Sequence, residues 1–228
     1  MPPRTAVANE WHGRDKSLTP NSEKDFSVHT VIIRHGERVD NVWADWRSAY
    51  VDHPVDDCPL SKRGRYQAER IAQELFLFKP KAVFSSPYQR CLSTMAPAAR
   101  RKSWEIKIEP GLGEVLDEHN YPPQYLIPHS IFRYYKDVPF DFDYNPVAKF
   151  FSLPAEPNLF RSERRIKRVI NELMIEYGLT GMIYMAHRFT CNLIVSMYTG
   201  ESVTFEPGTM AFLKCVNNKW IVDYLVQS

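Results

Sequence analysis

The sequence predicts one α/β domain of three layers, α/β/α, with a mostly parallel sheet and an antiparallel edge, and three observations support this. Short apolar runs at 28–33, 82–85 and 182–186 have the length of buried strands, and polar residues end each run. Amphipathic helical patterns lie between these runs, which is typical of βαβ units. Runs at 211–216 and 220–224, joined across Asn217-Asn218, indicate a closing hairpin.

The chain has the length and composition of one substantial globular domain. Its 228 residues suffice to bury a sizeable core, and a hydrophobic fraction of 44% is ordinary for a globular protein. Residues 1–26 mix Pro, Ser, Asn and charges without periodicity. We therefore expect a flexible leader at 1–26 and a single domain over 27–228.

Charge and cysteine usage exclude several classes of protein. A net charge of +2 provides no global field that would attract nucleic acid, and no apolar stretch has membrane-spanning length. We therefore expect neither a nucleic acid nor a membrane as a partner. The four cysteines are scattered without CxxC spacing, which favours a reduced, cytoplasmic protein over the alternative of a two-disulfide framework.

Helix signals follow the predicted strands in turn. Ser61 is expected to cap a helix that Pro80 stops, and the phrase from Ser85 to Arg90 resembles the start of a second helix. A short strand is expected at 106–108. Ser162 is expected to cap a later amphipathic helix that Gly178 ends.

The helix expected after Ser162 carries a run of basic residues. A solvated outer face explains such a run, and a binding surface is the alternative. The residues of the run are Arg161, Arg164, Arg165, Lys167 and Arg168.

Residues from about 115 to 160 form an aromatic-rich insertion with several prolines and poor periodicity. Long connections of this kind often serve as lids or binding loops. The aromatic side chains would suit an aromatic or steroid-like leaving group stacked under a lid. Ordinary packing of the insertion against the body is the alternative explanation.

Three of the predicted strands end in residues that suit phosphoryl chemistry. The ends are Arg34-His35, the phrase from Ser85 to Arg90, and His187-Arg188. Strand ends at one edge of a parallel sheet converge in space, so we expect these side chains to form one site. Neutral imidazole can attack phosphorus, and guanidinium groups can hold phosphoryl oxygens.

At these residues the sequence resembles the histidine phosphatase superfamily, which has the phosphoglycerate mutase-like fold. Arg34-His35-Gly36-Glu37 matches the RHG motif that follows the first strand in this family. The phrase from Ser85 to Thr94 looks like the segment of the second arginine, and Met185-Ala186-His187 looks like the segment of the second histidine. The resemblance covers about residues 28 to 225.

The resemblance implies a role for each matching residue. His35 would be the nucleophile that becomes phosphorylated, His187 would stabilise the transferring group, and Glu114 would protonate the leaving oxygen. It implies no metal, because arginines and His187 take over the electrostatic role of one, and it implies no other cofactor. A homodimer is plausible by the same resemblance. The phosphoryl oxygens would be bound by Arg34, Arg38 and Arg90, with Asn41 as a weaker match.

The extended phrase from Arg34 to Asp40 is similar to the phosphatase domain of the suppressor of T-cell receptor signalling proteins, a ubiquitin-associated and SH3-containing group. Members of that group act on phosphotyrosine, and an insect relative acts on steroid phosphates. The expected function is therefore a metal-independent phosphomonoesterase that uses a phosphohistidine. Its substrate would be a phosphorylated small molecule or a phosphoprotein, such as phosphotyrosine or another aromatic or steroid phosphate.

One residue departs from the family pattern. Arg188 stands where family members have a small residue after the second histidine. A long cation there could add a phosphate contact, face a carboxylate of the substrate, or partly fill the pocket. Arg188 therefore leaves open the alternative of a weakened domain that binds phosphorylated partners, and a phosphoglycerate mutase-type phosphotransferase is the other alternative.

Overall fold

The computed structural model describes residues 29–54, 56–116, 125, 128–150, 153, 155–156 and 158–228. The leader expected at 1–26 lies outside these residues. The strands are β1 (His29–Arg34), β2 (Ala82–Ser85), β3 (Ile106–Ile108), β4 (Met182–Ala186), β5 (Met210–Val216) and β6 (Lys219–Val226). They form one sheet in the order β3-β2-β4-β1-β5-β6. β3, β2, β4 and β1 pair in parallel, whereas β5 pairs antiparallel with β1 and β6.

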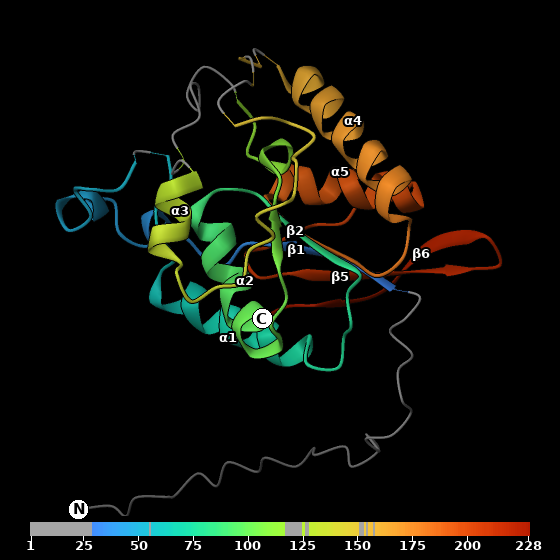
Figure 1. Cartoon of the computed structure of the whole chain (residues 1–228), viewed down its shortest axis with the longest axis horizontal. Helices are drawn as coiled ribbons and strands as arrows, with labels where there is room; N and C mark the ends of the chain where they lie inside the picture. Colours follow the sequence, from blue (N-terminus) through green and yellow to red (C-terminus); the bar gives the residue numbers. More distant parts are fainter. Residues whose placement is uncertain are drawn as a thin grey trace, which may run out of the picture.

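Helices cover both faces of this sheet, so the predicted three-layer fold is confirmed (Figure 1). The longer helices are α1 (Lys62–Glu74), α2 (Gln89–Lys102), α3 (Pro128–Tyr134), α4 (Leu159–Tyr177) and α5 (Arg188–Thr199). In Figure 1, α1 and α2 lie below the sheet and α4 and α5 lie above it. Three 3₁₀ turns complete the elements, at Val39–Asn41, Trp46–Ser48 and Pro110–Leu112.

The central strands are apolar because they are buried on both faces. In β1, Val31 and Ile33 pack with residues of α1, α2 and α3, whereas Ile32 packs on the other face with residues of α4 and α5. All three side chains are fully buried. The sheet centre is therefore rigid, and its strand ends provide fixed positions for polar side chains.

The helix caps agree with the sequence in one case and differ in another. Ser61 caps α1, and its hydroxyl accepts a hydrogen bond from the Gly64 backbone at 3.0 Å. The prediction that Ser162 caps α4 is wrong, because Asn158 does so. Ser162 lies inside the first turns of the helix and donates a hydrogen bond to Glu156.

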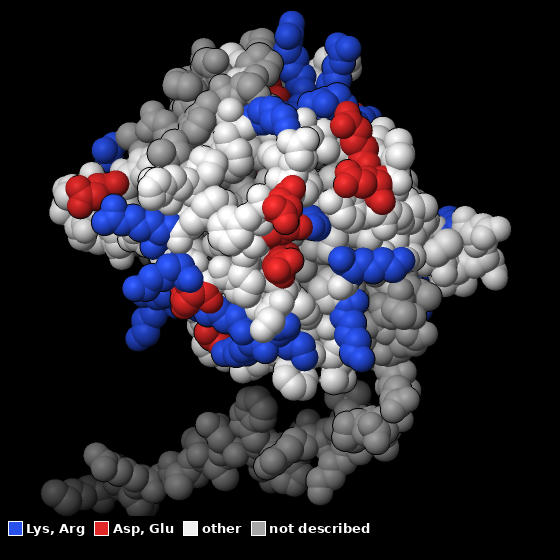
Figure 2. Space-filling view, in the orientation of Figure 1, with Lys and Arg blue, Asp and Glu red and all other residues white. Residues whose placement is uncertain are grey.

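The basic run of α4 is exposed, as predicted, at every position but one. Figure 2 shows Lys and Arg side chains gathered where Figure 1 places the start of α4. The expectation of a solvated side chain is wrong for Arg165, which is buried against Glu156. The exposed members are Arg161, Arg164, Lys167 and Arg168.

Described aromatic residues between 125 and 150 largely pack against the body. Tyr135 is buried on α2, where its hydroxyl lies 2.8 Å from Ser93 Oγ, and Tyr144 donates a hydrogen bond to the buried Glu109. Tyr134 and Phe142 remain exposed. Across the described residues, no helix combines the length and the apolar character that a membrane crossing requires.

Candidate active site

Three neighbouring parallel strands deliver polar residues to one edge of the sheet. His35 follows β1, His187 follows β4 and Ser86 follows β2, and β4 lies between the other two strands. The rings of His35 and His187 meet edge to face, with centroids 5.3 Å apart. The structure therefore brings together the strand ends that the sequence marks as polar.

His35 is held in one tautomer by the backbone of the next residue. Its Nδ1 lies 2.8 Å from the carbonyl oxygen of Gly36, which can only accept, so Nδ1 carries the proton. Nε2 is then left with a lone pair. Burial, with Arg90 and His187 as further causes, lowers the pKa of His35 well below its ordinary value. The imidazole is therefore neutral at physiological pH and suited to nucleophilic attack.

His187 is enclosed on both sides of its ring. Ser86 Oγ lies 2.8 Å from Nε2, and Glu114 Oε2 lies 3.3 Å from Nδ1. Burial lowers the pKa of His187 to about 4, although Glu114 opposes the shift. A neutral His187 with its Nδ1 proton toward Glu114 leaves Nε2 to accept from the Ser86 hydroxyl.

Arg90 is buried at the start of α2, and several contacts fix its guanidinium. Nη1 donates to the backbone oxygen of Asp56 at 2.9 Å, and the group stacks over the Tyr88 ring at 4.2 Å. Nη2 lies 3.6 Å from Glu114 Oε2. Asp57 lies 3.8 Å from Nη1 and also caps α2, and burial raises the pKa of Asp57 to about 7. Arg90 thus joins the site through Glu114, which also contacts His187.

Glu114 joins these groups from the segment after the 3₁₀ turn at Pro110–Leu112. Its carboxylate contacts both His187 and Arg90. Burial would raise the pKa of Glu114, but His187 and Arg90 outweigh burial and hold the pKa well below its ordinary value. The carboxyl group is therefore ionised at neutral pH.

The remaining predicted residues lie around this centre rather than within it. Arg34 donates to the Phe205 carbonyl at 2.6 Å and lines the same hollow as Glu114. Arg38 is paired with Asp40 by two hydrogen bonds. The exposed Asn41 accepts a hydrogen bond from the Arg38 backbone and has no described contact with either histidine.

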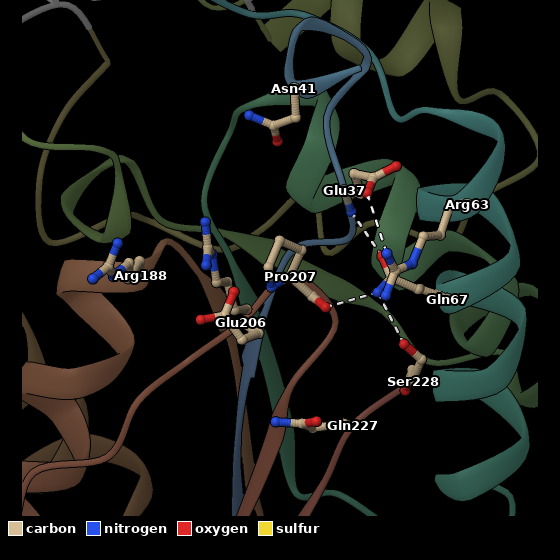
Figure 3. Close-up of a pocket in the computed structure, with 10 residues that line it drawn as sticks. Glu37, Asn41, Arg63, Gln67, Arg188, Glu206, Pro207, Gln227 and Ser228 are labelled. Atoms are coloured by element: carbon tan, nitrogen blue, oxygen red, sulfur yellow. Dashed lines mark hydrogen bonds and ion pairs between the residues drawn. The ribbon is translucent and has the colours of Figure 1, made fainter.

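Arg188 is the first residue of α5 and is exposed. Figure 3 shows it across a hollow from Arg63, which projects from α1. Arg34 lines this hollow too, and so does Asn41. Arg188 therefore stands at the mouth of the site beside Arg34, rather than in contact with the histidines.

The charges of the site favour an anion over a metal ion. His35, Glu114 and His187 offer ligand atoms within 4.8 Å of one another, which is a plausible ligand set for a metal. Arg90 beside Glu114 opposes a divalent cation and attracts an anion. Among the described residues of the site, Arg34 Nε and Arg90 Nε are buried without a hydrogen-bond partner, and the oxygens of an anion would provide acceptors.

Sequence reasoning missed several residues that support this site. Thr94 accepts a hydrogen bond from the Gly36 backbone at 2.9 Å, and Asp57 caps the helix that carries Arg90. Arg165 donates to the backbone oxygen of Glu114 at 3.0 Å. Thr94 lies in the phrase from Ser85 to Thr94 that resembles the family. Asp57 and Arg165 contact residues far from them in the sequence, so no local pattern predicts their roles.

A family model described as the histidine phosphatase superfamily (branch 1) matches residues 30–209. This match covers most of the chain and includes all eight predicted site residues. They are Arg34, His35, Arg38, Asn41, Arg90, Glu114, His187 and Arg188.

Two curated proteins are similar in sequence. The ecdysteroid-phosphate phosphatase of Drosophila melanogaster is 28% identical over 240 residues, which cover 88% of this chain and 31% of that protein. The transcription factor tau 55 kDa subunit of Saccharomyces cerevisiae is 35% identical over 95 residues, which cover 38% of this chain and 21% of that protein. The chain thus spans less than a third of the length of either relative.

Solved structures show the same fold at low sequence identity. The ecdysone phosphate phosphatase of Bombyx mori, in complex with tungstate, aligns with a TM-score of 0.66 and 18% identity, covering 88% of this chain and 92% of that one. A putative alpha-ribazole-5'-P phosphatase of Escherichia coli aligns with a TM-score of 0.59 and 17% identity, covering 89% and 97%.

Proposed function

Because the chain belongs to the histidine phosphatase superfamily, branch 1, we propose that it is a metal-independent phosphomonoesterase that works through a phosphohistidine. One observation carries the proposal: His35 is neutral and buried, its Nδ1 donates to the Gly36 carbonyl, and its Nε2 keeps the lone pair. An imidazole in this state is the nucleophile that such a reaction needs.

The phosphoryl group would be held by cations around His35. Arg90 and Arg34 offer guanidinium donors, and His187 would donate its Nδ1 proton once Glu114, which faces that proton in the structure, has itself taken up a proton. Charge accumulates on the equatorial oxygens during transfer, so fixed donors stabilise the transition state more than the ground state. Arg38 would act through its charge, because its guanidinium is already paired with Asp40. Asn41 would contact the substrate only at the mouth of the site.

Glu114 would supply a proton to the leaving oxygen. The group is ionised at neutral pH, so it must take up a proton as the substrate binds. The negative charge of a bound phosphate beside the carboxylate favours this uptake. Nε2 of His35 then forms a bond to phosphorus while the bond from phosphorus to the leaving oxygen breaks, and the Glu114 proton goes to that oxygen.

The second half of the reaction would reverse these roles. A water molecule attacks the phosphorus, the bond to Nε2 breaks, and the Glu114 carboxylate receives the proton that water loses. Inorganic phosphate leaves, and His35 returns to its neutral form. No atom or electron beyond those of water and substrate is required.

For the substrate, we propose an aromatic or steroid phosphate, with phosphotyrosine as one member of the class. The names of the Drosophila and Bombyx relatives support a steroid phosphate. The resemblance of the phrase from Arg34 to Asp40 to the suppressor of T-cell receptor signalling group supports phosphotyrosine.

A phosphate-binding module without turnover is the second candidate. The relative in yeast is named as a subunit of a transcription factor, not as an enzyme, which supports this candidate. Arg188 beside His187 is the residue of this chain that could weaken turnover. Both candidates require the same bound phosphate and differ only in whether a covalent bond to His35 forms.

Turnover of a simple aryl phosphate tests the proposal directly. With a chelator present throughout, we expect the wild type to hydrolyse 4-nitrophenyl phosphate and the His35→Ala variant to show no turnover, because the nucleophile is gone. Circular dichroism and a thermal melt would check that the variant is folded. Full activity in folded His35→Ala would contradict the proposal, and no activity in folded wild type that binds phosphate would favour the binding module.

A further inference from the structure

Two hollows flank Arg34 at the mouth of the site. The first, of about 420 Å³, lies between α1 and α5 and is lined by Glu37, Arg63 and Glu206 among others (Figure 3). The second, of about 490 Å³, is lined by Glu114, Phe189, Asn192 and Phe205 among others. Arg34 and Arg188 line both.

The position of Glu114 decides which hollow receives the leaving group. A general acid must lie within hydrogen-bond reach of the oxygen that it protonates. Glu114 lines the second hollow and does not line the first. If Glu114 is the acid, as the proposed function holds, the leaving oxygen and the group attached to it extend into the second hollow.

The second hollow has an apolar wall. Phe189 contributes a partly exposed aromatic ring to it, and Val203 contributes a partly exposed aliphatic side chain. Its volume is within the range of sites that bind small organic ligands. A flat or compact apolar leaving group, such as an aryl ring, would therefore fit against this wall.

The same hollow carries positive charge that its own residues do not neutralise. Within the described part of the chain, the exposed Arg188 guanidinium makes no hydrogen bond and no ion pair. Glu114 is the acidic residue of this hollow, and it is already engaged by Arg90 and His187. Glu206 shares the first hollow with Arg188, but within the described residues no hydrogen bond or ion pair joins the two. An unpaired cation at an aryl-sized hollow suits an anionic substituent on the leaving group.

We propose that the substrate is a small phosphomonoester whose leaving group combines an apolar body with a carboxylate, and that Arg188 binds this carboxylate. A guanidinium can hold a carboxylate through two parallel hydrogen bonds. The inference rests on the proposed function and adds to it the class of leaving group. Arg188 is then a specificity-determining residue rather than a phosphate ligand.

A pair of nearly isosteric substrates tests this role. The phosphate esters of 4-hydroxybenzoate and of 4-hydroxybenzamide have similar shapes and differ by one negative charge on the leaving group. We expect Arg188→Gln to lower kcat/KM about tenfold for the carboxylate ester, mainly through KM, because a charge-assisted hydrogen bond is lost. The carboxamide ester should change less than about twofold, and Arg188→Lys should retain part of the preference.

Arg63→Gln is the matched control, because Arg63 is an exposed arginine that lines only the first hollow. We expect it to leave the preference for the carboxylate ester unchanged. A loss of preference in Arg63→Gln but not in Arg188→Gln would place the leaving group in the first hollow and overturn the inference. An equal loss for both esters in Arg188→Gln would overturn it too, since Arg188 would then bind the phosphoryl group.

The same two esters distinguish failure of the proposed function from failure of the inference about Arg188. A folded wild type that hydrolyses neither ester would contradict the enzymatic function and the inference together. Hydrolysis of both esters with the same preference in wild type and Arg188→Gln would overturn the inference alone.

Discussion

At the scale of single residues, the site depends on protonation states that burial sets. His35 and His187 both have lowered pKa values because they are buried, with cationic Arg90 close by. Lowered pKa values keep both rings neutral through the physiological range, so one can attack and the other can donate a hydrogen bond. The charge of Arg90 therefore helps to lower the pKa of both rings, in addition to the phosphate binding that we propose for it.

Replacement of Glu114 should affect substrates differently, according to whether the leaving oxygen needs a proton. The Glu114→Gln variant should lose about 100-fold or more in kcat for an alkyl phosphate, whose leaving oxygen needs a proton. Hydrolysis of 4-nitrophenyl phosphate should fall less than about tenfold, because nitrophenolate leaves without one. Steady-state kinetics with the two substrates would measure the contrast.

The same residue predicts a pH dependence. The pKa of Glu114 is well below its ordinary value. The fraction of the enzyme–substrate complex in which Glu114 is protonated therefore falls as pH rises. Wild-type kcat/KM for the alkyl ester should therefore decrease from pH 5 toward pH 8, and this slope should flatten in Glu114→Gln. Equal losses for both substrates, with the slope intact, would remove Glu114 from the role of acid.

At the scale of elements, a buried ion pair ties α4 to the segment that carries Glu114. Arg165 pairs with Glu156 at 2.6 Å and donates to the backbone oxygens of Gly111 and Glu114. Glu156 in turn accepts a hydrogen bond from the Leu116 backbone. These contacts hold the segment from 111 to 116 at both of its ends, and with it the carboxylate of Glu114.

Replacement of this arginine should affect both stability and catalysis. We expect Arg165→Met to lower the free energy of unfolding by about 3 kcal/mol, because Glu156 would be left buried without its partner. Urea denaturation would measure the loss. The exposed Arg164 provides the control, since Arg164→Met should change stability by less than about 0.5 kcal/mol.

Activity separates a positioning role from a purely structural one. If Arg165 positions Glu114, the folded Arg165→Met variant should lose more activity toward an alkyl phosphate than toward 4-nitrophenyl phosphate. Unchanged relative activities would mean that Arg165 stabilises the fold without orienting the acid.

A close approach of two glycines fixes the turn after β1 against the start of α1. A Cβ atom on Gly36 would lie 2.7 Å from the Gly64 oxygen, and one on Gly64 would lie 2.1 Å from the Glu37 oxygen. Neither position has room for a side chain. The glycine of the RHG motif is therefore required by packing, which keeps His35 and its tautomer-fixing carbonyl in place.

At the scale of the whole molecule, local patterns were enough to predict the layers and the central strands. Buried strands are apolar along their length and are followed by polar residues, and this pattern predicted the positions of β1, β2 and β4. Two strand-like runs joined across Asn217-Asn218 predicted the hairpin of β5 and β6. The convergence of His35 with His187 followed from the parallel arrangement of their strands. The resemblance, rather than periodicity, supplied Glu114.

Long-range partners could not be predicted in the same way. Arg165 belongs to a run of basic residues that otherwise face solvent, and only the packing of Glu156 beside it explains its burial. The start of α4 was misplaced because Ser162 has the composition of a cap, whereas Asn158 occupies that position in the fold. The pairing of Arg38 with Asp40 also depends on a turn that the sequence did not mark.

The central claim is that phosphate is transferred to His35, and trapping the intermediate tests it most directly. Wild type and His35→Asn would be mixed with labelled aryl phosphate, quenched in alkali, where phosphohistidine survives, and digested for mass spectrometry. We predict label in the wild type on the peptide that contains His35 and none in the variant. Turnover without labelled enzyme, or label on His187 instead, would contradict the account.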